Sequence, residues 1–169
     1  MRNKENIMKD EVTAINDNSS NTELDFSIQR IYTKDISFEA PNVPEIFQSE
    51  WTPDVNLTLN TNSRAVFKDI HEVILHLTVT VKLQDKIAFL IEVQQAGIFT
   101  IKGFVEKQLD QVLRSFCPNI LFPYARELVS ETICRGSFPP LYLAPINFDT
   151  LYQEQRENLE SNGSVRYDG

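Results

Sequence analysis

HEVILHLTVTVKL at residues 71–83 and IAFLIEV at residues 87–93 decide the fold of this chain. In the first stretch, aliphatic residues fill every second position from Val73 to Leu83, and mostly polar residues stand between them. Such alternation is the period of a β-strand with one buried face. The second stretch places Ile87, Phe89, Ile91 and Val93 on one face, with Ala88, Leu90 and Glu92 on the other. Only Gln84-Asp85-Lys86 separates the two stretches. Together they predict an antiparallel hairpin.

A first strand is expected before this hairpin. Leu24, Phe26 and Ile28 share one face, and Arg30 and Ile31 then break the register as a β-bulge would. Residues 42–54 follow, with prolines and aromatic residues that are incompatible with an ordinary helix or a central strand. This segment is predicted to be a crossover loop.

A short edge strand is predicted next, where Val55, Leu57 and Leu59 alternate with polar residues. Residues 60–64 are polar and are expected to form a turn. Four strands are therefore expected before the chain changes its period.

A helical period begins after Gly103. One apolar stripe is expected to end at Cys117-Pro118, and a second helical run is predicted from Pro123 to Gly136, giving one broken helical arm. Asn147 is expected to cap a last helix. Strands followed by helices predict an α+β fold, with a four-stranded antiparallel sheet, a crossover connection and helices packed on one face.

The length of 169 residues and the apolar fraction of 41% are sufficient for one domain. We expect a flexible extension at residues 1–22, a folded domain at 23–160 and a disordered tail at 161–169. No stretch approaches the roughly 20 apolar residues of a membrane span, so the protein is predicted to be soluble and cytosolic.

Several classes of function have no support. The net charge of −8 argues against binding to a nucleic acid backbone. Cys117 and Cys134 have no metal-ligand spacing and are interpreted as reduced core residues. His71 and His76 lie on opposite faces of one strand, and the glycines form no phosphate-binding loop. We therefore predict no catalytic residue, metal or cofactor, and no enzyme activity.

Aromatic residues outside regular elements are unusually frequent, and many stand beside prolines: Phe47, Trp51, Phe122, Tyr124, Phe138, Tyr142 and Phe148. They can line a partly exposed groove, or they can close the core. The residues alone leave both readings open.

Three motifs carry a family resemblance: RIYTKDISFEAP at residues 30–41, CPNILFPYAR at 117–126 and LAPINF at 143–148. Together they closely resemble the SecB family of bacterial protein-export chaperones, over residues 26–151. The resemblance implies an ATP-independent holdase that binds unfolded preproteins and delivers them to the SecA motor. It also implies a homotetramer built as a dimer of dimers. The extension before Leu24 departs from the family.

The resemblance also implies site residues. The SecA-contact candidates are Asp35, Glu39, Leu90 and Glu92, and the oligomer-interface candidates are Ile91, Val93 and Gln95. Strand parity predicts that Leu90 and Glu92 point away from Ile91 and Val93. A client-binding groove is placed at Phe47, Trp51, Val55, Leu57, Leu59, Phe148, Leu151 and Tyr152.

Two alternatives stay open. One is a SecB-like chaperone for a client that is not exported. The other is a protein or enzyme that binds a small ligand in the aromatic pocket, which would require a closed cavity with a perturbed acid or base.

Overall fold

The structure, a computed structural model, describes residues 23–163. Its elements are β1 (Asp25–Glu39), the 3-10 helix η1 (Glu45–Gln48), β2 (Pro53–Phe67), β3 (Ile70–Leu83), β4 (Lys86–Lys102), α1 (Glu106–Gln111), the π-helical turn η2 (Val112–Phe116), α2 (Cys117–Arg135) and α3 (Phe148–Gly163).

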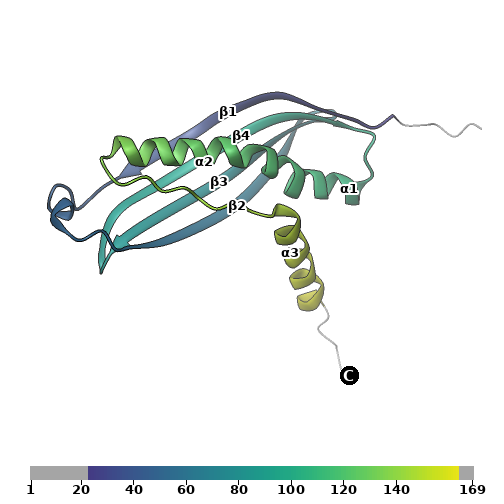
Figure 1. Ribbon diagram of the computed structural model, residues 1–169. Helices are drawn as coiled ribbons and strands as arrows, with labels where there is room; N and C mark the ends of the chain where they lie inside the picture. Colours follow the sequence, from purple (N-terminus) through teal and green to yellow (C-terminus); the bar gives the residue numbers. More distant parts are fainter. Residues whose placement is uncertain (1–22, 164–169) are drawn as a thin grey trace, which may run out of the picture.

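The strands form one four-stranded antiparallel sheet in the order β1-β4-β3-β2 (Figure 1). The predicted hairpin is confirmed as β3 and β4, with Val79 opposite Ile91. The segment that contains η1 carries the chain from β1 at one edge to β2 at the other, as expected for a crossover. The α+β fold class is therefore confirmed.

The predicted turn at residues 60–64 is wrong. β2 continues through these residues to Phe67, and the chain turns at Lys68 and Asp69. Asn60, Asn62 and Arg64 pair along β3, so their polar side chains continue the alternation on one face of the sheet. Strand pairing here overrides the low β-propensity of asparagine.

The predicted break in the helical arm is also wrong. The chain is helical from Glu106 to Arg135, Pro118 lies in the first turn of α2, and Pro123 lies inside that helix. Burial of the apolar face of α2 outweighs the backbone hydrogen bonds that the two prolines remove. The predicted end at Gly136 is confirmed, because Gly136 N–H bonds the carbonyls of the last helical turn.

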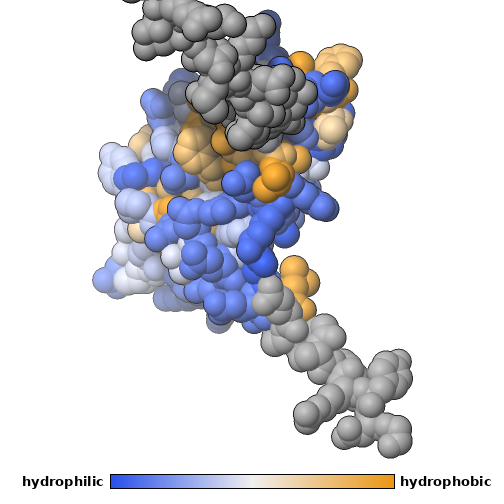
Figure 2. Space-filling model, turned by 90° about the vertical axis from the view of Figure 1, so that its right-hand side faces the viewer, coloured by the Kyte–Doolittle hydropathy of each residue, from blue (hydrophilic) through white to orange (hydrophobic). Residues whose placement is uncertain are grey.

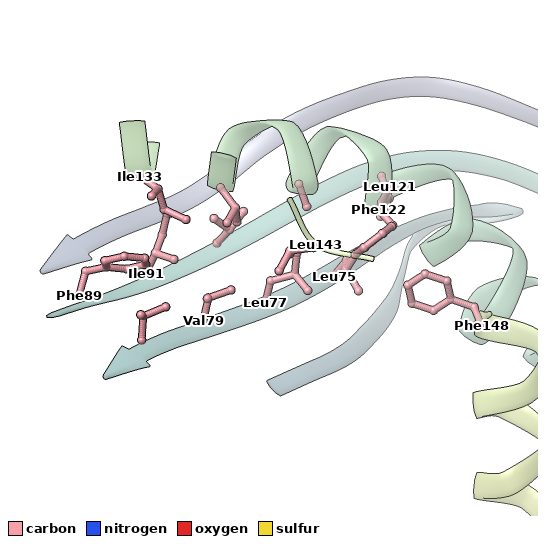
Figure 3. Packing of buried hydrophobic residues seen from close by; sticks show 14 of the residues in the cluster. Leu75, Leu77, Val79, Phe89, Ile91, Leu121, Phe122, Ile133, Leu143 and Phe148 are labelled. Carbon is pink, nitrogen blue, oxygen red and sulfur yellow. The ribbon is translucent and has the colours of Figure 1, made fainter. Parts of the chain in front are cut away.

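The core lies between α2 and the sheet (Figure 3). Side chains of α2 point toward alternate residues of β3 and β4: Leu121, Phe122 and Ile133 face Leu75, Leu77, Val79, Phe89 and Ile91. Each large apolar side chain buried here contributes roughly 1.5–3 kcal/mol. Gly97 permits this close approach, because a Cβ there would lie 2.6 Å from Phe99 and 3.0 Å from Leu121.

The last helix, α3, is fixed to the helical arm near its first turns. The backbone N–H of Thr150 donates to Asn147 Oδ1 at 3.1 Å, which confirms the predicted cap. Ser115 Oγ donates to Asp149 Oδ1 at 2.6 Å. α3 extends to Gly163, into the first residues of the predicted tail. The predicted extension at 1–22 and the rest of the tail lie outside the described residues.

Candidate functional site

The four SecA-contact candidates lie together on the face of the sheet opposite α2. Glu39 pairs with Leu90, and Glu92 lies two pairs further along, opposite Ser37. Asp35 pairs with Gln94 and shares the same parity. The three carboxylates are exposed and Leu90 is half-buried. We call Asp35, Glu39, Leu90 and Glu92 the acidic patch.

The three oligomer-interface candidates lie on the other face, beneath α2. Ile91 and Val93 belong to the core, which confirms that they point away from Leu90 and Glu92. Gln95 is also buried and accepts a long hydrogen bond of 3.4 Å from Thr33 Oγ1. Because none of the three offers exposed surface in the single chain, a role in assembly must be transmitted through α2 or β1.

The predicted client groove begins at a hollow of about 350 Å³ beside the crossover. Phe47 and Trp51 line it, and both rings contact Phe138, with centroid separations of 5.2 and 6.1 Å. Phe47 is exposed and Phe138 is buried. The floor of this hollow is therefore a buried aromatic ring.

Val55 and Leu57, the next groove candidates, lie on β2. They pair with Val81 and Val79, which are fully buried on the α2 face of the sheet. Val55 and Leu57 point to the same face but are 38% and 37% exposed. On this face of the sheet, the apolar side chains of the edge strand are therefore accessible to solvent, whereas those of the central strands are buried beneath α2.

A second hollow of about 310 Å³ lies beyond them, between β2 and α3. Leu59 and Leu151 line it together with polar residues such as Arg114. Seen from the end at which α3 lies, the surface toward this helix is largely hydrophilic, and hydrophobic surface gathers higher up (Figure 2). The α3 end of the groove is thus the more polar end.

Phe148 and Tyr152 were placed in the groove, and the structure gives both a second role. They are only 3% and 5% exposed, since Phe148 packs against Phe122 and the Tyr152 hydroxyl donates to Asp110 Oδ2 at 2.8 Å. Burial and this hydrogen bond raise the pKa of Tyr152. Both side chains anchor α3 and form only the base of the second hollow.

Two features were missed. Phe138 was noted as a loop aromatic but not assigned to the groove, although the proline pair after it marks a stiff segment. A larger hollow of about 590 Å³ lies on the outer side of α2, lined by Phe122, Arg126, Cys134 and Tyr142 among others. Cys134 is exposed there, so its prediction as a core residue is wrong, whereas Cys117 is buried.

Three groups outside the groove candidates have strongly shifted pKa values, and the largest shift is that of the Cys117 thiol, whose pKa burial raises to about 12. The pKa of Glu72 is lowered to about 2 by the hydrogen bond from Tyr32 and by Lys34 and Arg64, and burial raises the pKa of Tyr32 to about 12. Both groups lie on the face opposite α2. The described residues contain no group of three potential metal ligands. In residues 23–163 no helix is long and apolar enough to span a bilayer.

Comparison with known proteins identifies the family to which this chain is similar. Residues 19–159 match the family model described as preprotein translocase subunit SecB. The chain is similar to the protein-export protein SecB of Legionella pneumophila (strain Corby), with 55% identity over 146 residues, covering 86% of this chain and 90% of that protein. It is also similar to the protein-export protein SecB of Pseudomonas fluorescens (strain SBW25), with 55% identity over 139 residues, covering 82% and 87%.

Among solved structures, the chain resembles a SecB-like chaperone of Mycobacterium tuberculosis in complex with a ChAD peptide from the HigA1 antitoxin. The TM-score is 0.61 with 18% identity, covering 72% of this chain and 90% of that chain. At this identity the likeness concerns the fold.

Proposed function

The chain belongs to the SecB family, a family of preprotein-export chaperones, and we propose that it acts as an ATP-independent holdase that passes unfolded preproteins to SecA. The observation that carries this proposal is the row of open apolar side chains along β2, between a hollow at each end. We place the chaperone domain at residues 23–160 and the protein in the cytoplasm.

Client capture follows from the chemistry of the groove. Phe47, Trp51, Val55 and Leu57 present apolar surface beside the open edge of β2, which can pair with the backbone of an extended chain. Each client side chain buried there contributes roughly 1.5–3 kcal/mol, and ordering the segment costs several kcal/mol. A folded protein already buries these side chains in its own core, so only unfolded clients bind.

SecA docking is assigned to the acidic patch. Its carboxylates are exposed and the chain carries a net charge of −8, so the face attracts a basic partner. Exposed charge pairs contribute about 0–1 kcal/mol each, and they set the association rate and orientation more than the affinity. Leu90 supplies apolar contact beside Glu39, at one end of the patch.

Assembly into a homotetramer is proposed to raise the avidity of weak grooves. Several grooves on one particle make each later contact intramolecular, which can increase apparent affinity by about 10²–10⁴. Ile91, Val93 and Gln95 would support assembly from beneath, because they set the position of α2 on the sheet.

The groove is tested by Val55→Thr combined with Leu57→Thr. Both residues are partly exposed, so the double variant should still fold, whereas the binding free energy for the client should weaken by about 1–3 kcal/mol. Affinity for an unfolded preprotein is measured by fluorescence anisotropy, and light scattering with a sizing column checks assembly with unfolded and folded preprotein.

The matched control is Asn56→Ala with Thr58→Ala, which alters the same strand on its opposite face. Equal loss of client binding in the two double variants would rule out the groove as placed. A protein that gains equal mass with folded and unfolded preprotein would rule out the holdase function.

The acidic patch is tested by Glu92→Lys. Charge reversal at this exposed position should weaken SecA binding by about tenfold and leave client binding and the oligomer unchanged. Loss of the oligomer in this variant would show that the face is an assembly surface instead.

A further inference from the structure

The helix-free face of the sheet contains one buried carboxylate, which the proposed function does not use. Glu72 of β3 is only 3% exposed and accepts hydrogen bonds from Tyr32 Oη, from Lys34 Nζ at 2.9 Å and from Arg64 Nε at 2.6 Å. A buried carboxylate is tolerated only when its oxygens are paired, and here the partners come from both edge strands.

Two of these partners reach Glu72 across an intervening strand. β4 lies between β1 and β3, so Tyr32 and Lys34 must extend over it. Tyr32 pairs with Ala96 of β4, which is fully buried although it lies on the helix-free face. The small side chain of Ala96 leaves room for this crossing. Arg64 stands directly opposite Glu72 on β2.

Lys34, which Glu72 holds in this way, belongs to a β-bulge in β1. The register of β1 on β4 shifts between Thr33 and Asp35, so Lys34 is the extra residue. Tyr32 and Asp35 therefore lie on the same face although they are an odd number of residues apart. Without the extra residue, Asp35 and Glu39 would point toward α2.

We propose that Glu72 is a positioning residue for partner docking: by holding the bulged Lys34 it fixes the register that turns Asp35 and Glu39 into the acidic patch. Phe38 supports the same register from the other face, where its ring packs against Phe89 and Phe138. Glu72 thus holds β1 by polar contacts on the helix-free face, and Phe38 holds it by apolar contacts on the α2 face. We call these two sets of contacts the clamp. The inference rests on the SecA-docking role proposed above.

The decisive variant is Lys34→Met, because positioning and simple charge effects predict opposite results. Removal of a cation beside the patch makes this face more acidic, so charge alone would tighten binding of a basic partner. Release of the bulge should instead weaken binding of purified SecA, by roughly fivefold to tenfold. Glu72→Gln should weaken SecA binding to a similar extent, with unfolded-preprotein binding unchanged.

The control is Lys82→Met, which removes one positive charge from β3, on the helix-free face of the sheet, without a contact to β1. It should bind SecA at least as tightly as the unaltered protein. Tighter or unchanged binding of the Lys34→Met protein would overturn the proposal.

A second measurement does not depend on SecA. Amide hydrogen exchange at Ser37 and Glu39, whose N–H groups face β4, should become at least about tenfold faster in Glu72→Gln and in Lys34→Met, since a bulge that is no longer held opens more often. Unchanged exchange at both amides would overturn the clamp. Normal SecA binding by Asp35→Asn with Glu39→Gln would instead overturn the docking surface, and exchange would still decide the role of Glu72.

Discussion

Replacement of Glu72 by glutamine should remove a defined part of the pH dependence of folding. The hydrogen bond from Tyr32, followed by those from Lys34 and Arg64, lowers the pKa of Glu72 from 4.5 to about 2. A carboxylate with a depressed pKa stabilises the fold fully above its unfolded value, and this contribution is lost as the pH falls from about 4.5 to about 2. The gap corresponds to about 3 kcal/mol of unfolding free energy.

The assay is urea unfolding at several pH values between 7 and 2, followed by the fluorescence of Trp51, the single tryptophan. Chain concentration is held constant, because assembly would otherwise shift the transition. The difference between the unaltered protein and Glu72→Gln isolates this side chain, since the other carboxylates titrate in both proteins. We expect the difference to shrink by about 3 kcal/mol between pH 5 and pH 2. A difference that stays constant over this range would refute the reasoning.

Two further predictions concern packing. Gly97→Ala should lower the free energy of unfolding by about 1–3 kcal/mol, since the new methyl group would lie 2.6 Å from the Phe99 ring in a closely packed core; urea unfolding measures this, and unchanged stability would mean that α2 can move away from β4. Tyr152→Phe should lower the free energy of unfolding by about 1 kcal/mol, because it removes the hydroxyl group that donates to Asp110 and keeps the packed ring. It should also speed amide exchange in α3 and leave client affinity unchanged. A loss of client affinity would show that the Tyr152 side chain contributes to client binding.

The sequence was sufficient for features that depend on a repeated local pattern. Alternation from Val73 to Leu83 predicted the central hairpin, and parity placed Glu92 and Ile91 on opposite faces. The turn predicted at residues 60–64 failed because polar residues are also suitable for the exposed side of an edge strand once a partner strand is present. Pro123 was mistaken for a helix start because burial along α2, which no local signal reports, outweighs its missing N–H.

The residues proposed for the client groove differ in their exposure. Trp51, Val55 and Leu57 are exposed apolar residues, as a groove requires. Phe148 and Tyr152 are instead buried by contacts within the chain. The cluster around Glu72 could not be predicted, because Tyr32 and Lys34 reach it across β4 and Lys34 belongs to a bulge. Such contacts depend on strand order and register, which are properties of the assembled sheet.

The proposed client groove and the acidic patch lie on opposite sides of the same sheet, so a preprotein and SecA can occupy one protomer together in a ternary complex. They do not compete for space, and each can influence the other only through a coupling free energy carried by the strands between them. Thermodynamic linkage makes that coupling equal in both directions. If both sites act as proposed, a preprotein that weakens SecA binding by a given factor is itself bound more weakly by the same factor when SecA is present.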